Sequence, residues 1–424
     1  MAQKEASCYV YVQLPGTAAP VPCASLRVRA VGADTYEGTF TYGARYLERP
    51  NVISLDPFHL PLQARPMRFT KLKGIPGAAR DASPDAWGRR VIQAKLARSE
   101  ADITEMEYLL SGPDDGAGNL SFGLALTPPG PRRPYNRTRQ LAALTAAAQS
   151  IEDDGRLPHE VLEELEPGTS MGGARPKATV EDDHRIWLAK FPERRDAHNM
   201  QRIEYATLEI ARVAGLRVCG ARLERTGARD VLMLERFDRQ WDPQLAAYRR
   251  HGLVSGLTVL DAEDGHLGRE RWSYLLLADE LRRWSSKHQD DRHELFRRMV
   301  FNAMVSNSDD HPRNHALINA GAGWRLSPAY DIVPAPMVSQ ERRDLALTIG
   351  SFGRTASVFN LLSRSDVFGL DRATGERIMA DMLDVVRTWR EFFAGHGVEE
   401  RSIAMLESAM LPPSYFRTEP VQPV

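Results

Sequence analysis

The chain has 424 residues, 42% of them hydrophobic and 26% charged, which is typical of a globular protein with two or three domains and a large core. Its 55 Lys and Arg almost balance 56 Asp and Glu, so no global basic field favours nucleic-acid binding. No run of about 18 apolar residues predicts a membrane span. Three cysteines without metal-ligand spacing and the lack of a signal-peptide pattern predict a cytoplasmic protein.

The first third of the chain is predicted to be rich in β-structure. Residues 8 to about 65 contain short alternating segments typical of strands. A helix is predicted to begin near Ser83, with Ser83 as its N-cap and Pro84 at its first position. The proline-rich stretch 128–134 predicts a break, and a helix around 140–151 should follow it.

A different pattern begins with the small-residue loop from Gly168 to Lys177. The next apolar segment, 185–191, is predicted to be a buried strand that carries Lys190. A helix from about Asn199 to Ala214 should follow, with Glu204 at the border of its apolar face and Gly215 after its end.

The rest of the chain is predicted to be one more strand and then mainly helices. The strand covers 231–237 and ends in a polar segment. Amphipathic helices are expected at 271–284, 291–305 and 376–393. Together these elements predict an α+β protein with a β-rich first part and a mostly helical second part.

The strongest indication of chemistry is the segment from Asn307 to Asn314. Asp309 and Asn314 have the D-x4-N spacing of kinase catalytic loops, in which the Asp accepts a hydroxyl proton and the Asn holds a metal ion. A β-hairpin is predicted between Asn314 and Asp331, with its turn at 320–323. Such a hairpin would return the chain to its starting end, so that Asn314 and Asp331 meet as two oxygen ligands for Mg²⁺.

A simpler interpretation is that Asn307, Ser308 and Asp309 only cap the end of the preceding helix, because Asp and Asn are common loop residues. His311 would either assist at the phosphates or fix the loop by hydrogen bonding, and we prefer the second role. The context of the hairpin and Asp331 favours catalysis over capping.

Further residues follow the order in which a kinase presents its ATP-binding groups. Gly172 and Gly173 would let the backbone approach phosphates, Lys190 would reach the α- and β-phosphates, and Glu204 would hold Lys190 as its counter-ion. The strand end, Glu235 to Phe237, would offer backbone groups to adenine. Each residue also has a purely structural interpretation. The two glycines could form a plain turn, and Lys190 could lie on an edge strand. Glu204 could be a surface residue of its helix, and Phe237 could belong to the core.

Across nearly its whole length the chain resembles the HipA family of kinase toxins from bacterial type II toxin–antitoxin modules. The similarity lies in five motifs and in the N-terminal strand module. The motifs are Ser170–Ala178, the strand ending at Lys190, Glu235–Arg239, Asn307–Asn314 and Ser327–Asp331, with Pro84-Asp85-Ala86-Trp87-Gly88-Arg89 in the N-terminal part.

The resemblance implies a two-subdomain, protein-kinase-like fold and a serine/threonine kinase that uses ATP and Mg²⁺. It divides the chain into 1–130, an N-terminal module; 131–240, the ATP-binding part; and 241–424, the helical subdomain. It implies Asp309 as the catalytic residue, Asn314 and Asp331 as metal ligands, and Ser170 as an autophosphorylation site that switches the kinase off. The implied ATP-binding residues are Gly172, Gly173, Ala174, Arg175, Pro176, Lys177, Lys190, Glu235, Arg236, Phe237, His311, Asn314 and Asp331.

The same resemblance implies partners. They are a helix-turn-helix antitoxin similar to HipB, operator DNA reached through that antitoxin, and a protein substrate such as an aminoacyl-tRNA synthetase. No His-Arg precedes Asp309, and Asp331 is followed by Ile332-Val333, so an activation-loop mechanism is in doubt. Two other functions remain open: a metal-dependent phosphohydrolase using Asp309, Asp310, His311 and Asp331, and a non-catalytic co-repressor.

Overall fold

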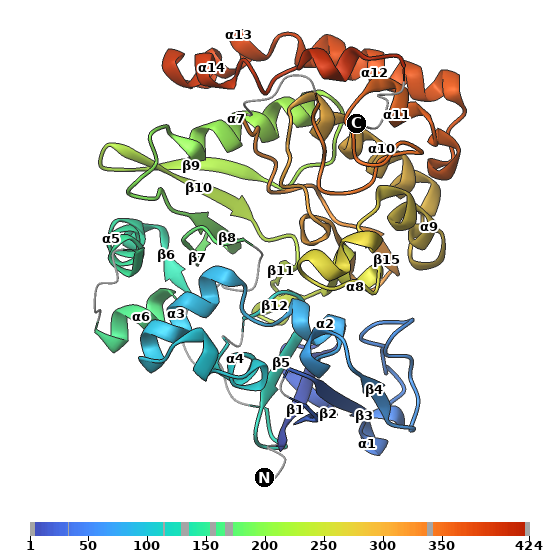
Figure 1. Cartoon of the computed structure of the whole chain (residues 1–424). Coiled ribbons are helices and arrows are strands. Elements are labelled where there is room, and N and C mark those ends of the chain that lie inside the picture. The colour runs from blue at the N-terminus through green and yellow to red at the C-terminus, as the bar shows by residue number, and fades with distance from the viewer. Residues whose placement is uncertain are drawn as a thin grey trace. The chain divides into compact units, whose positions relative to one another are not determined.

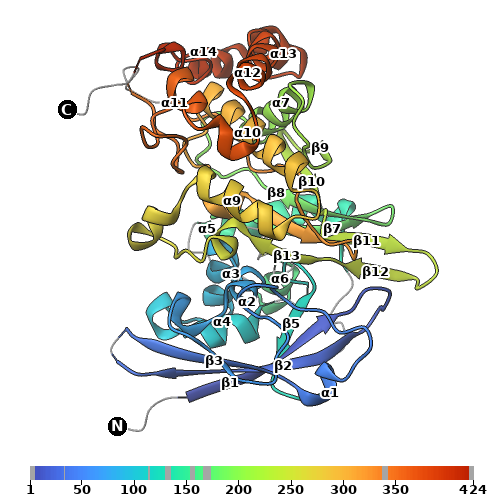
Figure 2. The ribbon, with the colours of Figure 1, turned by 90° about the vertical axis from the view of Figure 1, so that its right-hand side faces the viewer.

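The N-terminal part of the chain forms a five-stranded antiparallel sheet in the computed structural model, which describes residues 5–32, 34–112, 115–128, 135–152, 158–165, 173–336 and 342–419. Its strands lie in the order β4-β3-β2-β1-β5 (Figure 1). Figure 2 shows the paired strands β1, β2 and β3 of this sheet from another side. Their bounds are β1 (Glu5–Gln13), β2 (Pro20–Ala30), β3 (Tyr36–Tyr42), β4 (Met67–Phe69) and β5 (Leu120–Gly123). Val10, Tyr11 and Val12 of β1 are all fully buried, so this strand is covered on both faces.

The chain divides into two compact units, each assembled from separate stretches. Unit 1 consists of Met1–Arg194, Met233–Thr258 and Ile318–Ala322, and unit 2 of Arg195–Leu232, Val259–Leu317 and Gly323–Val424. The division passes inside β10 (Arg229–Glu235), α8 (Gly256–Val259) and β14 (Ala316–Asn319).

Unit 1 contains a second sheet in which β6 (Asn136–Arg137), β7 (Lys177–Asp182) and β8 (Arg185–Lys190) lie in sequence order, followed by β10. β8 is therefore an interior strand, and the edge-strand interpretation of Lys190 is wrong. The other elements of unit 1 are α1 (Ala44–Leu47), α2 (Gly77–Asp81), α3 (Ala86–Leu96), α4 (Glu105–Ser111), α5 (Leu141–Glu152), α6 (His159–Leu165), the hairpin of β11 (Arg239–Asp242) and β12 (Ala247–Arg250), and β13 (Gly252–Ser255).

Helix α3 begins two residues later than the sequence predicts. Its N-cap is Asp85, whose carboxylate accepts a hydrogen bond from the Gly88 N–H. Ser83 and Pro84 therefore precede the helix, and the prediction of Ser83 as N-cap is wrong. Asp and Ser cap helices about equally well, so propensity alone does not choose between them.

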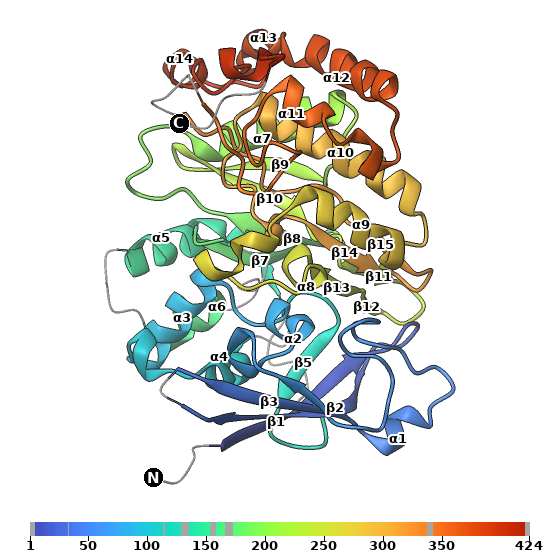
Figure 3. The same ribbon diagram turned by 45° about the vertical axis from the view of Figure 1, so that its right-hand side comes forward.

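Unit 2 is mostly helical, and its longest helices, α10 (His288–Met304) and α12 (Arg372–Val386), contact each other and frame its core. Helix α9 (Tyr274–Trp284) lies beside α10 (Figure 3). Leu295, Phe296 and Met299 of α10 are fully buried. The remaining elements are α7 (Met200–Val213), β9 (Ala221–Thr226), β15 (Trp324–Leu326), α11 (Val358–Leu362), α13 (Trp389–Gly395) and α14 (Glu400–Leu406).

The single helix predicted at 376–393 is two helices, α12 and α13. The break lies at Arg387 and Thr388, where the Thr388 hydroxyl donates to the Val385 carbonyl, 2.9 Å away. A side-chain bond of this kind competes with the helical backbone bond at that carbonyl. Other expected elements are found close to their predicted places: α5, β8, α7, β10, α9 and α10.

The predicted α+β class is confirmed, with strands concentrated in the first part of the chain and helices in the last. The division into 1–130, 131–240 and 241–424 stays a prediction. Among the described residues, no helix combines the length and the apolar character that a membrane crossing requires.

Candidate functional site

The loop after α10 separates two neighbouring carboxylates. Asp309 is exposed, whereas Asp310 is 2% exposed. The carbonyl oxygen of Asp309 accepts hydrogen bonds from the His311 N–H at 2.8 Å and from Asn314 Nδ2 at 3.0 Å. The Asn314 amide nitrogen is thereby tied to the loop, which leaves its Oδ1 as the group that can ligate a cation.

Asp310 holds this loop from inside unit 2. Its Oδ2 accepts a hydrogen bond from the Tyr274 hydroxyl, and its Oδ1 lies 3.1 Å from His315 Nε2. Asn302 Nδ2 donates to the same hydroxyl at 3.0 Å. The Asp310 carboxylate therefore contacts buried side chains within unit 2, whereas the Asp309 side chain is exposed.

Asn307 lies two residues beyond Val305, the C-cap of the preceding helix, and its bonds help to close the end of that helix. Its N–H donates to the Asn302 carbonyl at 2.9 Å, and its side chain donates to Asn302 Oδ1 at 3.1 Å. Capping does not extend to Asp309, whose bonds run forward to His311 and Asn314. His311 supports the loop through its backbone, and its ring Nδ1 is buried without a hydrogen-bond partner among the described residues.

The predicted hairpin between Asn314 and Asp331 is formed by β14 and β15. Its turn contains Gly321 and Gly323, both with positive φ, and Asn319 Oδ1 accepts from the Gly321 N–H. At its base the Ser327 N–H donates to the Ala316 carbonyl at 2.8 Å. The Tyr330 hydroxyl donates to the Arg313 carbonyl at 2.7 Å. The residues next to Asp331 and to Asn314 are thus bonded to each other, as the sequence predicts.

Asp331 itself has a left-handed backbone, with φ of 57°. This conformation is uncommon for residues other than glycine and is frequent at functional sites, where the surroundings enforce it. The enforcing contacts lie just before it: the Ala329 N–H donates to the Arg217 carbonyl, and the Ala329 carbonyl accepts from the Cys219 N–H. An aspartate oxygen and an amide oxygen on a fixed loop and hairpin are the hard ligands that suit Mg²⁺.

Buried charges on α10 support the same hairpin, and sequence reasoning did not single them out. Asp291 is fully buried and accepts from Arg325 Nε, Arg325 Nη2 and the Leu326 N–H, each at 2.9 Å. The buried Arg298 ion-pairs with Glu294 at 3.0 Å and donates to the Ser327 carbonyl. The i, i+4 spacing of Glu294 and Arg298 was the available signal for this pair.

In unit 1, Lys190 is the last residue of β8 and is 7% exposed. Its cross-strand partner is Lys177, the first residue of β7. Glu204 lies on α7 of unit 2 and is 5% exposed, so its interpretation as a surface glutamate is wrong. The pairing of Lys190 with Glu204 joins residues of different units and stays a prediction.

The described part of the glycine loop begins at Gly173, whose φ is +90°; Ser170 and Gly172 lie outside the described residues. Ala174 is exposed, Arg175 is half-buried with Nε 3.9 Å from Glu193 Oε1, and the Pro176 carbonyl accepts from the Phe191 N–H. Lys177 is 1% exposed, and its ammonium donates to Asp85 Oδ2 and to the Gly173 carbonyl. This geometry fits an anchor of the loop rather than the expected contact with ATP.

The segment after β10 contains another buried cation, Arg236. Arg236 is 1% exposed, and its guanidinium ion-pairs with Asp115 at 2.8 Å and with Asp238 at 2.9 Å. Its N–H donates to the Ile186 carbonyl at 2.8 Å, so it is already used by the sheet and does not fit the expected contact with adenine. Glu235 and Phe237 on either side are both half-buried, and Phe237 is therefore not a fully buried core residue.

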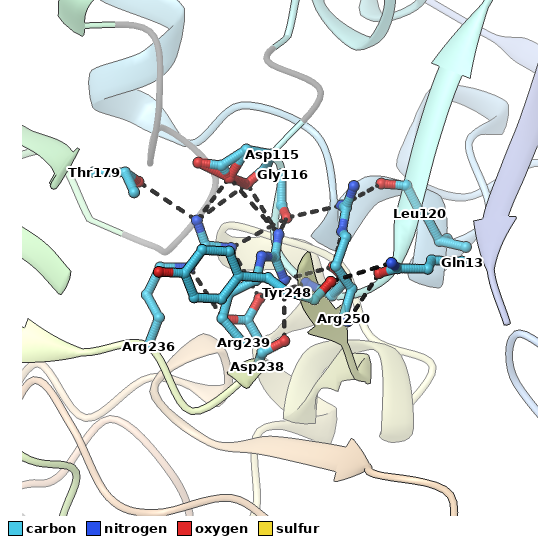
Figure 4. A network of polar contacts seen from close by, with 11 residues as sticks. Gln13, Asp115, Gly116, Leu120, Thr179, Arg236, Asp238, Arg239, Tyr248 and Arg250 are labelled. Atoms are coloured by element: carbon cyan, nitrogen blue, oxygen red, sulfur yellow. Dashed lines mark hydrogen bonds and ion pairs between the residues drawn. The ribbon is translucent and has the colours of Figure 1, made fainter. Parts of the chain in front are cut away.

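Figure 4 shows the arginine network around this segment, which consists of Asp115, Arg236, Asp238, Arg239 and Arg250. Asp238 Oδ2 also accepts from Arg239 Nη1 at 2.7 Å and from the Gly118 N–H. Burial favours a higher pKa for Asp238, but the two guanidinium groups outweigh it and hold the pKa far below its usual range. Burial, with repulsion from Arg239, lowers the pKa of Arg250 to about 9.

Comparisons with known proteins agree with these features. Residues 169–389 match the model of the HipA-like C-terminal domain. The serine/threonine-protein kinase toxin HipA of Shewanella oneidensis is 26% identical over 290 residues, which cover 61% of this chain and 63% of that relative. The chain thus matches less than two thirds of the length of this curated relative.

A solved structure has a similar fold. A chain in the complex of toxin–antitoxin proteins HipA and HipB with operator DNA, from Shewanella oneidensis, is 18% identical, and the match covers 94% of each chain with a TM-score of 0.64. This similarity confirms the predicted HipA-like fold. Because the family model also spans more than half of the sequence, the chain belongs to the family defined by the HipA-like C-terminal domain.

Proposed function

We propose that the chain is a serine/threonine protein kinase that uses ATP and Mg²⁺ and acts as the toxin of a toxin–antitoxin pair. The observation that carries this proposal is the arrangement within unit 2. There an exposed Asp309 adjoins an oriented Asn314, and a hairpin brings the segment of Asp331 back to that of Asn314. Base and metal ligands of this type are what phosphoryl transfer requires.

In the proposed reaction, Asp309 accepts the proton of the attacking serine or threonine hydroxyl. Asn314 Oδ1 and an Asp331 carboxylate oxygen would hold Mg²⁺, which neutralises charge on the phosphates when bound. His311 contributes backbone bonds that fix the loop, and its half-buried side chain lies two positions after the base in sequence.

The residues of unit 1 supply the nucleotide-binding groups of the proposal. Lys190 would contact the α- and β-phosphates, with Glu204 as its counter-ion. The backbone around Gly173 and Ala174 would approach the phosphates, and Glu235 and Phe237 would present backbone groups to adenine. Lys190 and Glu204 are both buried, so each charge requires a partner; their pairing with each other is part of the proposal.

The biological role is proposed from the relatives. HipA of Shewanella oneidensis is named a kinase toxin, and the solved structure holds HipA together with HipB and operator DNA. We infer a HipB-like antitoxin partner with a helix-turn-helix, operator DNA bound through it, and a translation component such as an aminoacyl-tRNA synthetase as substrate. Autophosphorylation at Ser170, outside the described residues, would switch the kinase off by placing negative charge near the ATP phosphates.

The test is phosphoryl transfer from labelled ATP to proteins of a cell lysate, followed by mass spectrometry of the phosphorylated sites. We expect Mg²⁺-dependent phosphoserine or phosphothreonine, including Ser170 of the chain itself, and none with Asp309→Asn. Release of free phosphate without phosphoprotein would favour the phosphohydrolase. A wild-type protein that binds its antitoxin but transfers no phosphate would favour the co-repressor.

The surroundings of Asp310 do not favour the phosphohydrolase. That function would use the Asp310 carboxylate as a metal ligand, but this carboxylate is 2% exposed, and its Oδ2 accepts a hydrogen bond from the Tyr274 hydroxyl. A carboxylate held in this way supports its loop.

A further inference from the structure

A buried ion pair joins α3 to the base of the glycine loop, and the proposed reaction gives it no role. Lys177 Nζ lies 2.9 Å from Asp85 Oδ2, and these side chains are 1% and 8% exposed. Burial raises the pKa of the Asp85 carboxyl, which the Lys177 ammonium partly offsets. Because a buried ion pair is often no more stabilising than apolar residues of similar size, its presence points to a need for defined geometry.

The same end of α3 makes two more bonds to the loop through Trp87, which is fully buried. The Trp87 backbone N–H donates to the Gly173 carbonyl at 3.4 Å, and the indole Nε1 donates to the Lys177 carbonyl at 2.9 Å. The Gly173 carbonyl also accepts from Lys177 Nζ at 2.9 Å. The carbonyls at both ends of the segment 173–177 are therefore held by groups of α3 or by Lys177.

Holding the Gly173 carbonyl determines the direction of the next N–H. The described peptide bonds are all trans, and in a trans peptide the C=O and the following N–H point in opposite directions. The Ala174 N–H is therefore directed away from Trp87 and Lys177, and Ala174 is exposed. Gly173 permits this orientation because its φ of +90° is rarely adopted by other residues.

The ion pair also distinguishes two lysines that are neighbours across the strands. Lys177 and Lys190 are directly paired in the β7–β8 register, so their side chains leave the same face of the sheet. Two ammonium groups at paired strand positions would repel each other if neither charge were neutralised. The Asp85 carboxylate neutralises the Lys177 ammonium and so reduces this repulsion.

We propose that Asp85, through Lys177, and Trp87 are positioning residues, which hold the carbonyls at both ends of the segment 173–177 and so present the Ala174 N–H to the phosphates of ATP. This inference rests on the proposed function and assigns α3 the role of fixing the phosphate-binding loop. Backbone N–H groups on a fixed loop are effective phosphate ligands because they need no reorganisation when the anion arrives.

The test uses two conservative variants, each with a matched control. Asp85→Asn keeps a capping acceptor for α3 but loses the charge that holds Lys177. Trp87→Phe keeps the aromatic packing but loses the indole donor. The controls are Asp371→Asn, at the exposed N-cap of α12, and Trp272→Phe, whose indole donates to the Glu263 carbonyl.

Isothermal titration calorimetry with ATP, ADP and adenosine measures the effect. We expect both variants to bind ATP and ADP about tenfold more weakly, the loss that corresponds to one charge-assisted hydrogen bond, and to bind adenosine as the wild type does. Both controls should bind all three ligands like the wild type. A loss confined to the phosphate-bearing ligands separates positioning from general destabilisation, which would weaken adenosine binding equally.

Two results would overturn the inference while leaving the proposed kinase intact: ATP affinity unchanged in both folded variants, or equal losses for ATP and adenosine. A wild-type protein that binds no ATP would refute both proposals. If Asp85→Asn does not fold, as far-UV circular dichroism will show, Trp87→Phe carries the test, because it preserves the buried ion pair.

Discussion

Asp309 and Asp310 are adjacent in sequence but have opposite environments, and chemistry follows environment rather than residue type. Asp309 is exposed and is the proposed base, whereas Asp310 accepts a hydrogen bond from the Tyr274 hydroxyl and its Oδ1 lies 3.1 Å from His315 Nε2. The D-x4-N spacing predicts Asp309 as the base, and Asp309 is the exposed one of the two carboxylates; its catalytic role stays a prediction. The sequence gives no sign that Asp310 supports the loop, because Tyr274 lies 36 positions away.

Replacing Asp309 or Asp310 by asparagine should therefore have different consequences. Asp309→Asn should abolish phosphoryl transfer and leave ATP affinity and the melting temperature nearly unchanged, since an exposed substitution alters stability by about 0.5 kcal/mol or less. Asp310→Asn should lower stability by about 1–3 kcal/mol, because it disturbs a buried hydrogen-bonded group. Urea unfolding and a kinase assay on both variants measure the difference. Substantial activity in Asp309→Asn would contradict its role as the base.

At the scale of elements, the sequence predicts the strands, helices and hairpin that carry the candidate site, because their periodicity and turn residues are local. It does not distinguish Lys177 from Lys190. Both are lysines at strand ends, and the carboxylate that engages Lys177 lies 92 positions earlier, at the N-cap of α3. Asp85 and Trp87 stand in a motif that the sequence shows plainly, yet their role depends on this long-range contact.

Arg236 illustrates the same limit at the end of β10. Its place directly after this strand is close to the prediction, which ended the strand at residue 237, but its burial with Asp115 depends on a segment 121 positions away. The arginine network joins that segment to β11 and β12 within unit 1, through bonds from Arg239 and Arg250 to the Gly118 carbonyl. These bonds therefore fix the backbone next to Glu235 and Phe237, the residues on either side of Arg236.

The network predicts a specific pH dependence of stability. The pKa of Asp238 is lower when folded than its unfolded value of about 3.9, so its contribution is present above that pH and is lost as the pH falls below it. Asp238→Asn should therefore cost about 3–5 kcal/mol at pH 7, as expected for a broken buried ion pair, and progressively less below pH of about 4.

Urea unfolding at pH 7 and pH 3 measures this difference. Asp366→Asn is the matched control, because that carboxylate is 71% exposed in its ion pair with Arg364. An Asp238→Asn deficit that stays constant between the two pH values would show that the ion pairs are not its source.

At the scale of the whole molecule, the chain builds each unit from stretches that are far apart in sequence. Residues 233–258 belong to unit 1 although the residues before and after them belong to unit 2. Domain boundaries predicted along a sequence assume that each domain is one contiguous segment. Side-chain burial and strand pairing can instead bring together segments that are far apart in the sequence. The position of β1 shows this on a smaller scale: its second neighbour in the sheet, β5, follows more than 100 residues later.

Ligand binding to the whole chain gives the last prediction. A ligand that binds only the folded state stabilises it by about 2.7 kcal/mol at a concentration 100-fold above its Kd. We expect ATP with Mg²⁺ to raise the melting temperature by this route and ATP with EDTA to raise it much less, because two of the proposed ligands of the metal, Asn314 and Asp331, are oxygen donors. Differential scanning fluorimetry over a range of ATP concentrations measures both.

Asp331→Asn is the variant of choice for this experiment. Asparagine tolerates the left-handed backbone of residue 331 and is close in size to aspartate, so the variant removes charge without adding strain. The Mg²⁺-dependent part of the shift should fall sharply in Asp331→Asn and persist in the exposed control Asp366→Asn. A full Mg²⁺-dependent shift in Asp331→Asn would mean that the metal is held elsewhere, since loss of a charged ligand must weaken the binding of a divalent cation at its own site.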